Sequence, residues 1–200
     1  MFLILGSLVI STACIVSANE DQTIHSFTAT NIYKEEVDLS EYSGKVVLIV
    51  NVASKCGYTD IGYKELQQLY KDLGGDNHFT VLGFPCNQFG NQEPEKEMAI
   101  EKFVKDQYNV RFPMFSKVDV TGEDAHPLWK YLVKESGVKP SWNFFKYLVD
   151  HTGQVVEVFP TKTSLWKYDS AGAYDQIKRC IKRAKKYSKD VKTKNVKNEL

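Results

Sequence analysis

The sequence predicts an α/β fold in which a mixed central sheet is flanked by helices, and three observations predict it. Residues 46–50 form an unbroken aliphatic and β-branched run, which is typical of a strand covered on both faces. A helical pattern and a second buried strand at 79–84 follow, and a right-handed crossover makes the two strands parallel. Near the C-terminus, residues 144–149 and 154–159 have the pattern of an antiparallel hairpin.

A short segment before the first strand and a helix after it are also predicted from local patterns. Residues 23–41 alternate apolar and polar side chains between turn signals, which predicts a short hairpin-like segment. The first helix begins near Thr59 and ends at glycines 74 and 75, which suit a helix C-cap. Its buried face is expected to carry Ile61, Leu66, Leu69 and Leu73.

The second half of the chain adds helices at 95–108 and 126–135, with a strand at 114–120 between them. A final helix begins near Tyr174. The residues expected to face inward are Met98, Ile100, Phe103 and Val104 in the first of these helices and Ile177, Cys180 and Ile181 in the last. Alternating strands and helices before a closing hairpin and helix predict a thioredoxin-like fold, with additions at the N-terminus and in the middle.

The net charge of +1 combines an acidic body with a basic tail. From Lys178 to the end there are ten Lys or Arg and two Asp or Glu residues, so the tail carries +8 and the remainder −7. An acidic body argues against nucleic acid as the main partner. A basic tail alone is more often a solvated helix end than a binding site.

Both ends of the chain resemble targeting signals. Residues 2–16 are apolar or small and uncharged, which predicts a signal peptide at 1–18, cleaved before Asn19. An uncleaved anchor is the alternative, although the run is short for a membrane span. Residues 197–200 (KNEL) are a variant of the retrieval tetrapeptide of the endoplasmic reticulum. We therefore expect one domain at 19–185, a basic tail at 186–200 and a location in the reticulum lumen, with secretion as the alternative.

Without Cys14, which leaves with the signal, the chain keeps Cys56, Cys86 and Cys180, an odd number that leaves at least one thiol free. Cys56 follows the first buried strand and precedes a helix N-terminus, where free N–H groups and the helix dipole favour a thiolate. The alternative is a small buried hydrophobe. The segment from Cys56 to Thr59 is not a C-x-x-C pair, and no Cys and His spacing predicts a metal site.

Four motifs then resemble one family in their order and spacing: NVASKCGYTD, FPCNQFGNQEP, FPMFSKVDVTG and WNFFKYLV. They are similar to those of the glutathione peroxidases, over about residues 27–181. The resemblance implies that Cys56 is the peroxidatic residue and that Gln92, Trp142 and Asn143 are its catalytic partners. Their N–H groups are neutral donors, suited to stabilise the thiolate and the oxyanion that develops when the peroxide O–O bond breaks. Taken singly, each has another reading, as a solvated loop residue, a core aromatic and a turn residue.

The product of such a reaction is a sulfenic acid, which a second thiol must reduce. Thioredoxin-dependent members of the family carry a second cysteine in the helix after the Gln-Glu-Pro motif, and this chain has none there. Cys86 is the remaining resolving candidate, because the endoplasmic-reticulum members of the family closely resemble this chain and the resemblance implies a resolving role for a cysteine at this position. The alternative is that Cys86 is a packing residue. Cys180 is expected to be inert.

The predicted function is a cysteine-type peroxidase that reduces hydrogen peroxide and organic or lipid hydroperoxides. Glutathione or a thioredoxin-like protein such as a disulfide isomerase would be the co-substrate, with no other cofactor. The turn at 136–140 is too short for the oligomerisation loop of the family's tetramers, so a monomer is expected. The alternatives are a peroxide sensor, a partner-binding module and a general thiol–disulfide oxidoreductase.

Overall fold

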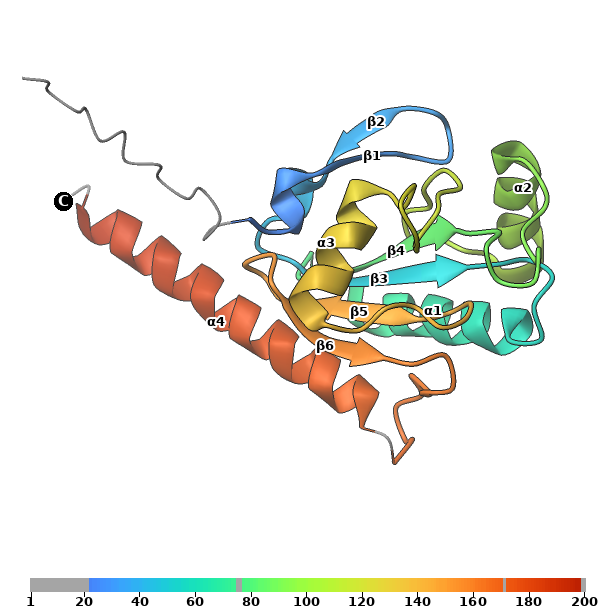
Figure 1. The fold of residues 1–200 in the computed structure, drawn as a ribbon. Coiled ribbons are helices and arrows are strands. Elements are labelled where there is room, and N and C mark those ends of the chain that lie inside the picture. The colour runs from blue at the N-terminus through green and yellow to red at the C-terminus, as the bar shows by residue number, and fades with distance from the viewer. Residues whose placement is uncertain (1–21, 75–76, 171, 199–200) are drawn as a thin grey trace, which may run out of the picture.

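The computed structural model describes residues 22–74, 77–170 and 172–198 (Figure 1). Its centre is a four-stranded sheet in the order β4-β3-β5-β6. The strands are β3 (Val46–Val52), β4 (Phe79–Pro85), β5 (Lys146–Val149) and β6 (Val155–Phe159). β3 pairs parallel with β4 and antiparallel with β5, and β5 pairs antiparallel with β6. The predicted parallel pair and closing hairpin are therefore confirmed.

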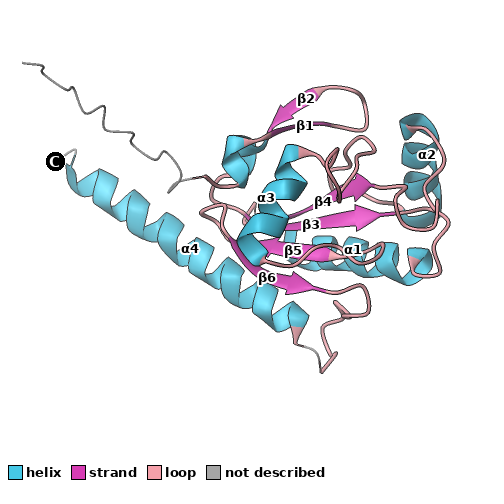
Figure 2. Cartoon of the chain, viewed as in Figure 1, coloured by secondary structure: helices cyan, strands magenta, loops and turns pink. Residues whose placement is uncertain are grey.

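Helices and a small hairpin surround this sheet, as the cartoon in Figure 2 shows by secondary structure. The α-helices are α1 (Thr59–Leu73), α2 (Glu97–Tyr108), α3 (Pro127–Ser136) and α4 (Ala173–Asn198). The hairpin pairs β1 (Thr28–Thr30) with β2 (Glu36–Asp38), and short 3-10 helices lie at η1 (Ile24–Ser26) and η2 (Leu39–Tyr42). The thioredoxin-like fold is confirmed.

The two faces of the sheet are covered by different elements because side chains alternate along each strand. Val46, Leu48, Val50 and Val52 belong to a core that includes residues of α1, α2 and α4. Val47 and Ile49 point the other way, into a core with α3 and the N-terminal segment. All seven residues of β3 are buried, which accounts for its unbroken aliphatic sequence.

The predicted strand at 114–120 does not form. Only isolated bridges join Met114 to Gly83 and Phe115 to Asn31. The segment divides its backbone hydrogen bonds between two elements, because Phe115 N–H donates to Gly83 of β4 and Ser116 N–H to Thr30 of β1. A segment that bridges two elements in this way satisfies its polar backbone without a continuous ladder.

Two residues predicted for buried helix faces are instead exposed. Ile61 of α1 is 48% exposed and Met98 of α2 is 85% exposed. In α1 the predicted Leu66 and Leu69 are buried, and Gly62 and Tyr63 take the inner position expected of Ile61. The signal peptide predicted at residues 1–18 lies outside the described residues. No helix in the described part of the chain has the length and apolar character that a membrane span requires.

Candidate active site

Cys56 lies in the loop between β3 and α1, at the carboxyl end of the central strand. Two hydrogen bonds fix this loop. Cys56 N–H donates to Thr59 Oγ1 at 2.9 Å, and that hydroxyl donates to the Ala53 carbonyl at 2.8 Å. The hydroxyl of Thr59, the first residue of α1, therefore joins the end of β3 to Cys56 and fixes the turn between them.

The Cys56 sulfur is half-buried and faces the beginning of α1. Tyr58 N–H donates to Cys56 Sγ at 3.4 Å. A hydrogen-bond donor at the positive end of a helix dipole stabilises negative charge on sulfur. The loop thus offers a thiolate one direct donor on a residue that is only half-buried.

The loop after β4 brings Gln92 to the cysteine loop. Lys55 N–H, the backbone donor next to Cys56, bonds to the Gln92 carbonyl at 2.9 Å. The Lys55 ammonium also pairs with the Glu95 carboxylate at 2.9 Å. The loops that leave the neighbouring parallel strands β3 and β4 are therefore joined, as expected at the carboxyl edge of an open α/β sheet.

Asn143 and Trp142 come from the segment before β5 and complete this group of loops. Asn143 is fully buried, and its side-chain N–H group donates to Gln92 Oε1 at 2.9 Å and to the Phe89 carbonyl at 3.4 Å. Trp142 is 37% exposed, and its ring lies 6.0 Å from that of Phe89. The structure thus brings Gln92, Trp142 and Asn143 together beside the Cys56 loop.

Asn51, a polar residue inside the aliphatic strand β3, holds this segment in place. Its side chain donates to the Trp142 carbonyl at 3.0 Å and accepts from Phe145 N–H at 3.0 Å. Phe144 between them has a φ of 60°, a left-handed conformation that is strained for a bulky residue. The Asn51 carbonyl accepts from Phe144 N–H at 2.7 Å, and the Asn51 N–H donates to the Phe145 carbonyl at 3.3 Å, so one residue of β3 makes four hydrogen bonds that hold the strained turn.

Glu93 is a second buried polar residue that the sequence motifs did not single out. It is completely buried, and Oε1 accepts from the Ser54 hydroxyl at 2.5 Å. Burial raises the pKa of its carboxyl to about 7. Within the described chain, neither Glu93 Oε2 nor the nearby buried hydroxyl of Tyr63 has a hydrogen-bond partner.

Glu93 ties three segments together. Its side chain holds Ser54, two residues before Cys56, and its carbonyl accepts from the Lys117 ammonium at 3.0 Å. Its N–H group donates to Asn87 Oδ1 at 2.8 Å, which closes the loop after β4. Nothing in the sequence marks a glutamate in a polar loop as buried, so Glu93 could not have been found. Asn51 could have been, because a polar residue near the end of an aliphatic strand indicates a buried side chain that makes hydrogen bonds.

Cys86 and Cys180 lie apart from this arrangement. Cys86 is completely buried at the end of β4, and it packs in the core that contains α3, whereas Cys56 packs against the core on the opposite face of the sheet. Burial raises the pKa of the Cys86 thiol to about 11 and also raises that of Cys180. All three described cysteines are free thiols.

Comparisons with known proteins identify the family. The family model for glutathione peroxidase matches residues 24–133. Glutathione peroxidase 7 of Mus musculus is 55% identical over 139 residues, which cover 70% of this chain and 74% of the mouse protein. Glutathione peroxidase 7 of Homo sapiens is 52% identical over 148 residues, covering 74% of this chain and 79% of the human protein. The chain belongs to the glutathione peroxidase family.

Solved structures agree with this assignment. The crystal structure of Trgpx in apo form superposes with a TM-score of 0.65 at 37% identity, covering 80% of this chain and 97% of that one. The protein is therefore a thiol peroxidase, an oxidoreductase that reduces hydroperoxides on a thioredoxin-like fold.

Proposed function

We propose that Cys56 is the peroxidatic residue of this enzyme and that Gln92, Trp142 and Asn143 form the site around it. The observation that carries the proposal is the junction of three loops, in which Lys55 N–H bonds to Gln92 and Gln92 bonds to Asn143. Cys56 is the half-buried nucleophile at this junction, with a helix N-terminus behind it.

The reaction begins when the Cys56 thiolate attacks one peroxide oxygen. An S–O bond forms, the O–O bond breaks, and the other oxygen leaves as hydroxide or alkoxide and takes up a proton. Cys56 becomes a sulfenic acid. A first reducing thiol condenses with it and releases water, and a second thiol then frees Cys56 and forms the disulfide product.

The three partners have different parts in this step. Since Gln92 Oε1 is occupied by the Asn143 amide, the amide of Gln92 is held in one orientation with its N–H donors directed away from Asn143. In the described chain, no acceptor is bonded to the half-exposed Trp142 indole N–H, which leaves it able to stabilise the departing oxygen. Asn143, buried behind them, positions Gln92.

The reductant is proposed to come from outside the chain, as glutathione or as a reduced thioredoxin-like protein such as a disulfide isomerase. Cys86 is the internal candidate for the second thiol. Its complete burial on the opposite face of the sheet favours a packing role, because one of the two cysteines would have to leave its layer before a bond could form. No bound cofactor is required by this chemistry.

We place the enzyme in the lumen of the endoplasmic reticulum, with secretion as the alternative, on the strength of the apolar segment at 2–16 and the terminal KNEL sequence. The short connection between α3 and β5 supports a monomer, because it leaves no room for an added oligomerisation loop.

The experiment is oxidation of the mature protein by hydrogen peroxide and by a lipid hydroperoxide, followed by thiol trapping and intact mass measurement. We expect a sulfenic acid on Cys56 that is absent in Cys56→Ser. The matched control is Cys180→Ser, which removes another half-buried thiol and is expected to oxidise at the wild-type rate. Absence of oxidation at Cys56 by either peroxide would refute the proposal.

A third variant, Cys86→Ser, tests the source of the reductant. If Cys86 is a packing residue, the variant oxidises normally and the sulfenic acid captures added glutathione or the thiol of a reduced thioredoxin-like protein. A disulfide between Cys56 and Cys86 in the wild type, absent in this variant, would overturn the external reductant and assign the resolving role to Cys86. Fast oxidation with negligible turnover by any added thiol would instead indicate a peroxide sensor.

A further inference from the structure

One exposed face of α4 carries four lysines, here called the lysine row. Lys178, Lys182, Lys185 and Lys189 follow one another at intervals of four, three and four residues, a spacing that places them on one face of a helix. All four are exposed. Three more exposed basic residues flank this lysine row: Arg179, Arg183 and Lys186.

The charge pattern of α4 differs from that of the other helices. In α1 and α2, exposed lysines pair with a carboxylate four residues away, as Lys64 does with Asp60 and Lys102 with Asp106. In α4 no acidic residue occurs between Asp175 and Asp190. Like charges four residues apart destabilise a helix, so this pattern does not serve the stability of α4 by itself.

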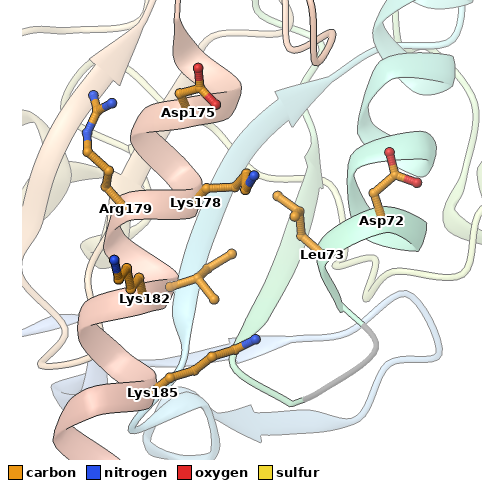
Figure 3. A pocket seen from close by; sticks show the side chains of 8 residues that line it. Asp72, Leu73, Asp175, Lys178, Arg179, Lys182 and Lys185 are labelled. Carbon is orange, nitrogen blue, oxygen red and sulfur yellow. The ribbon is translucent and has the colours of Figure 1, made fainter.

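The lysine row borders a hollow of about 480 Å³ between α4 and the C-terminal end of α1 (Figure 3). Leu73 of α1 and Ile181 of α4 line it with apolar surface. In Figure 3, Lys178 and Lys185 extend from α4 toward the end of α1 that carries Leu73. The hollow therefore combines an apolar wall with a cationic rim, and Asp72 and Asp175 complete its lining.

A second hollow of about 560 Å³ adjoins the first along α4. It is lined only by basic residues, among them Lys182, Lys186 and Lys189. Arg179, Lys182 and Lys185 line both hollows, so the two adjoin. We call them together the basic groove, although only the first has a second wall, at α1, and the second lies between side chains of α4 alone. From Lys178 to Lys189 the helix rises roughly 17 Å, the length of about five residues of extended chain.

We propose that this groove binds an acidic segment of a protein partner, with an apolar side chain of the segment in the hollow beside Leu73 and its carboxylates along the lysine row. Opposite charge and an apolar contact are the features that the groove offers. An anionic bilayer fits less well, because a helix that lies on a membrane inserts its apolar face. The apolar face of α4, with Ile177, Ile181 and Ala184, is already buried against the core.

The position of the groove separates it from the peroxide site. α1 begins at the Cys56 loop, and its other end, 15 residues on, lines the groove. At 1.5 Å per residue, the two sites are roughly 20 Å apart. A partner bound through its acidic segment would leave Cys56 open to peroxide and would be held near it at high effective concentration. The proposal does not depend on the chemistry assigned to Cys56.

The test measures binding of a fluorescent peptide, rich in glutamate with one leucine, to the mature protein by anisotropy. The variant Lys178→Gln/Lys182→Gln/Lys189→Gln removes three charges from the lysine row. The matched control, Lys96→Gln/Lys130→Gln/Lys139→Gln, removes three exposed charges elsewhere. We expect the first variant to bind about tenfold more weakly and the control to bind as the wild type does. Replacing the leucine of the peptide by serine should also weaken binding.

The same measurement in Cys56→Ser separates this proposal from the catalytic one, because binding should be unaffected while peroxide oxidation is lost. Peptide binding should fall as salt rises, since exposed charges are screened. An equal loss of binding in the two triple variants would overturn the proposal by showing that only net charge matters. Binding of the wild type to phosphatidylserine vesicles but not to the peptide would overturn it in favour of a membrane surface.

Discussion

At the scale of single residues, Glu93 predicts a specific pH dependence of stability. Its carboxyl has a pKa of about 7 in the folded chain and 4.5 as its ordinary value. Between these values the folded state binds more protons than the unfolded state, so the free energy of unfolding falls as pH rises from about 4.5 to 7. The full effect is on the order of 3 kcal/mol.

The variant Glu93→Gln isolates this contribution, because the amide keeps the shape and can still accept from the Ser54 hydroxyl. Urea unfolding at several pH values should show Glu93→Gln gaining stability relative to the wild type as pH rises from 5 to 7.5, within the window set by the folded pKa of about 7. Glu95→Gln is the control, since Glu95 is an exposed carboxylate two residues away. Parallel profiles for Glu93→Gln and the wild type would contradict the assigned pKa.

A residue could be placed from the sequence when its position depends on neighbours along the chain, and not when it depends on residues that are distant in the sequence. Cys56 could be placed before a helix N-terminus because a buried strand and a helix are both local patterns. Gln92, Trp142 and Asn143 were predicted together, because the family motifs that contain them occur in the same order and spacing. The burial of Glu93 could not be predicted, because it depends on Ser54 and Lys117, which approach it only in the folded chain.

At the scale of secondary-structure elements, the packing of α1 against the Trp142 segment predicts the effect of changing Gly62. A Cβ at this position would overlap the ring of Phe144. Alanine is the better helix former by about 1 kcal/mol, but overpacking costs about 1–3 kcal/mol. We therefore expect Gly62→Ala to destabilise the protein in chemical unfolding. It should also slow oxidation of Cys56, because the new methyl group pushes α1, which follows the Cys56 loop, away from Phe144 in the strained turn.

A double variant supplies the control for Gly62. Phe144→Leu shortens the side chain that meets the new methyl group, so Gly62→Ala/Phe144→Leu should be more stable than the sum of the two single effects predicts. Additive effects would mean that the ring of Phe144 is not what limits the space at Gly62.

The elements also show where local pattern was insufficient. The segment at 114–120 has the composition of a strand, but its hydrogen bonds are divided between β4 and β1, which only the assembled sheet determines. Met98 was expected to face inward, but it lies two residues before Ile100, about 160° around the helix from it, so the helical period itself places Met98 on the outer face of α2. β3 was predicted well because all seven of its residues are buried, and α1 because its buried residues, Leu66 and Leu69 among them, recur with the helical period.

At the scale of the whole molecule, α4 divides into a part that serves the fold and a part that does not. Its buried residues are Ala173, Tyr174, Ile177, Ile181 and Ala184. Beyond them, the ring of Tyr187 still lies 5.0 Å from that of His151, although Tyr187 is 55% exposed. Val191 is 38% exposed, and in Figure 1 the C-terminal turns project past the body. Ala184 is the last fully buried residue among those of α4 whose side chains the structure describes, and the helix continues for about four turns after it.

Truncation after Ser188 should therefore leave the free energy of unfolding almost unchanged, whereas Ile177→Ala, which empties a fully buried position, should cost about 2–4 kcal/mol. Chemical unfolding of both variants measures the difference, and Val191→Ala is the control for a residue in the projecting part. A large loss of stability on truncation would mean that the projecting turns pack on the body. If stability is retained while acidic-peptide binding weakens through loss of Lys189, then the end of α4 serves interaction rather than folding, and its basic charge needs a partner to explain it.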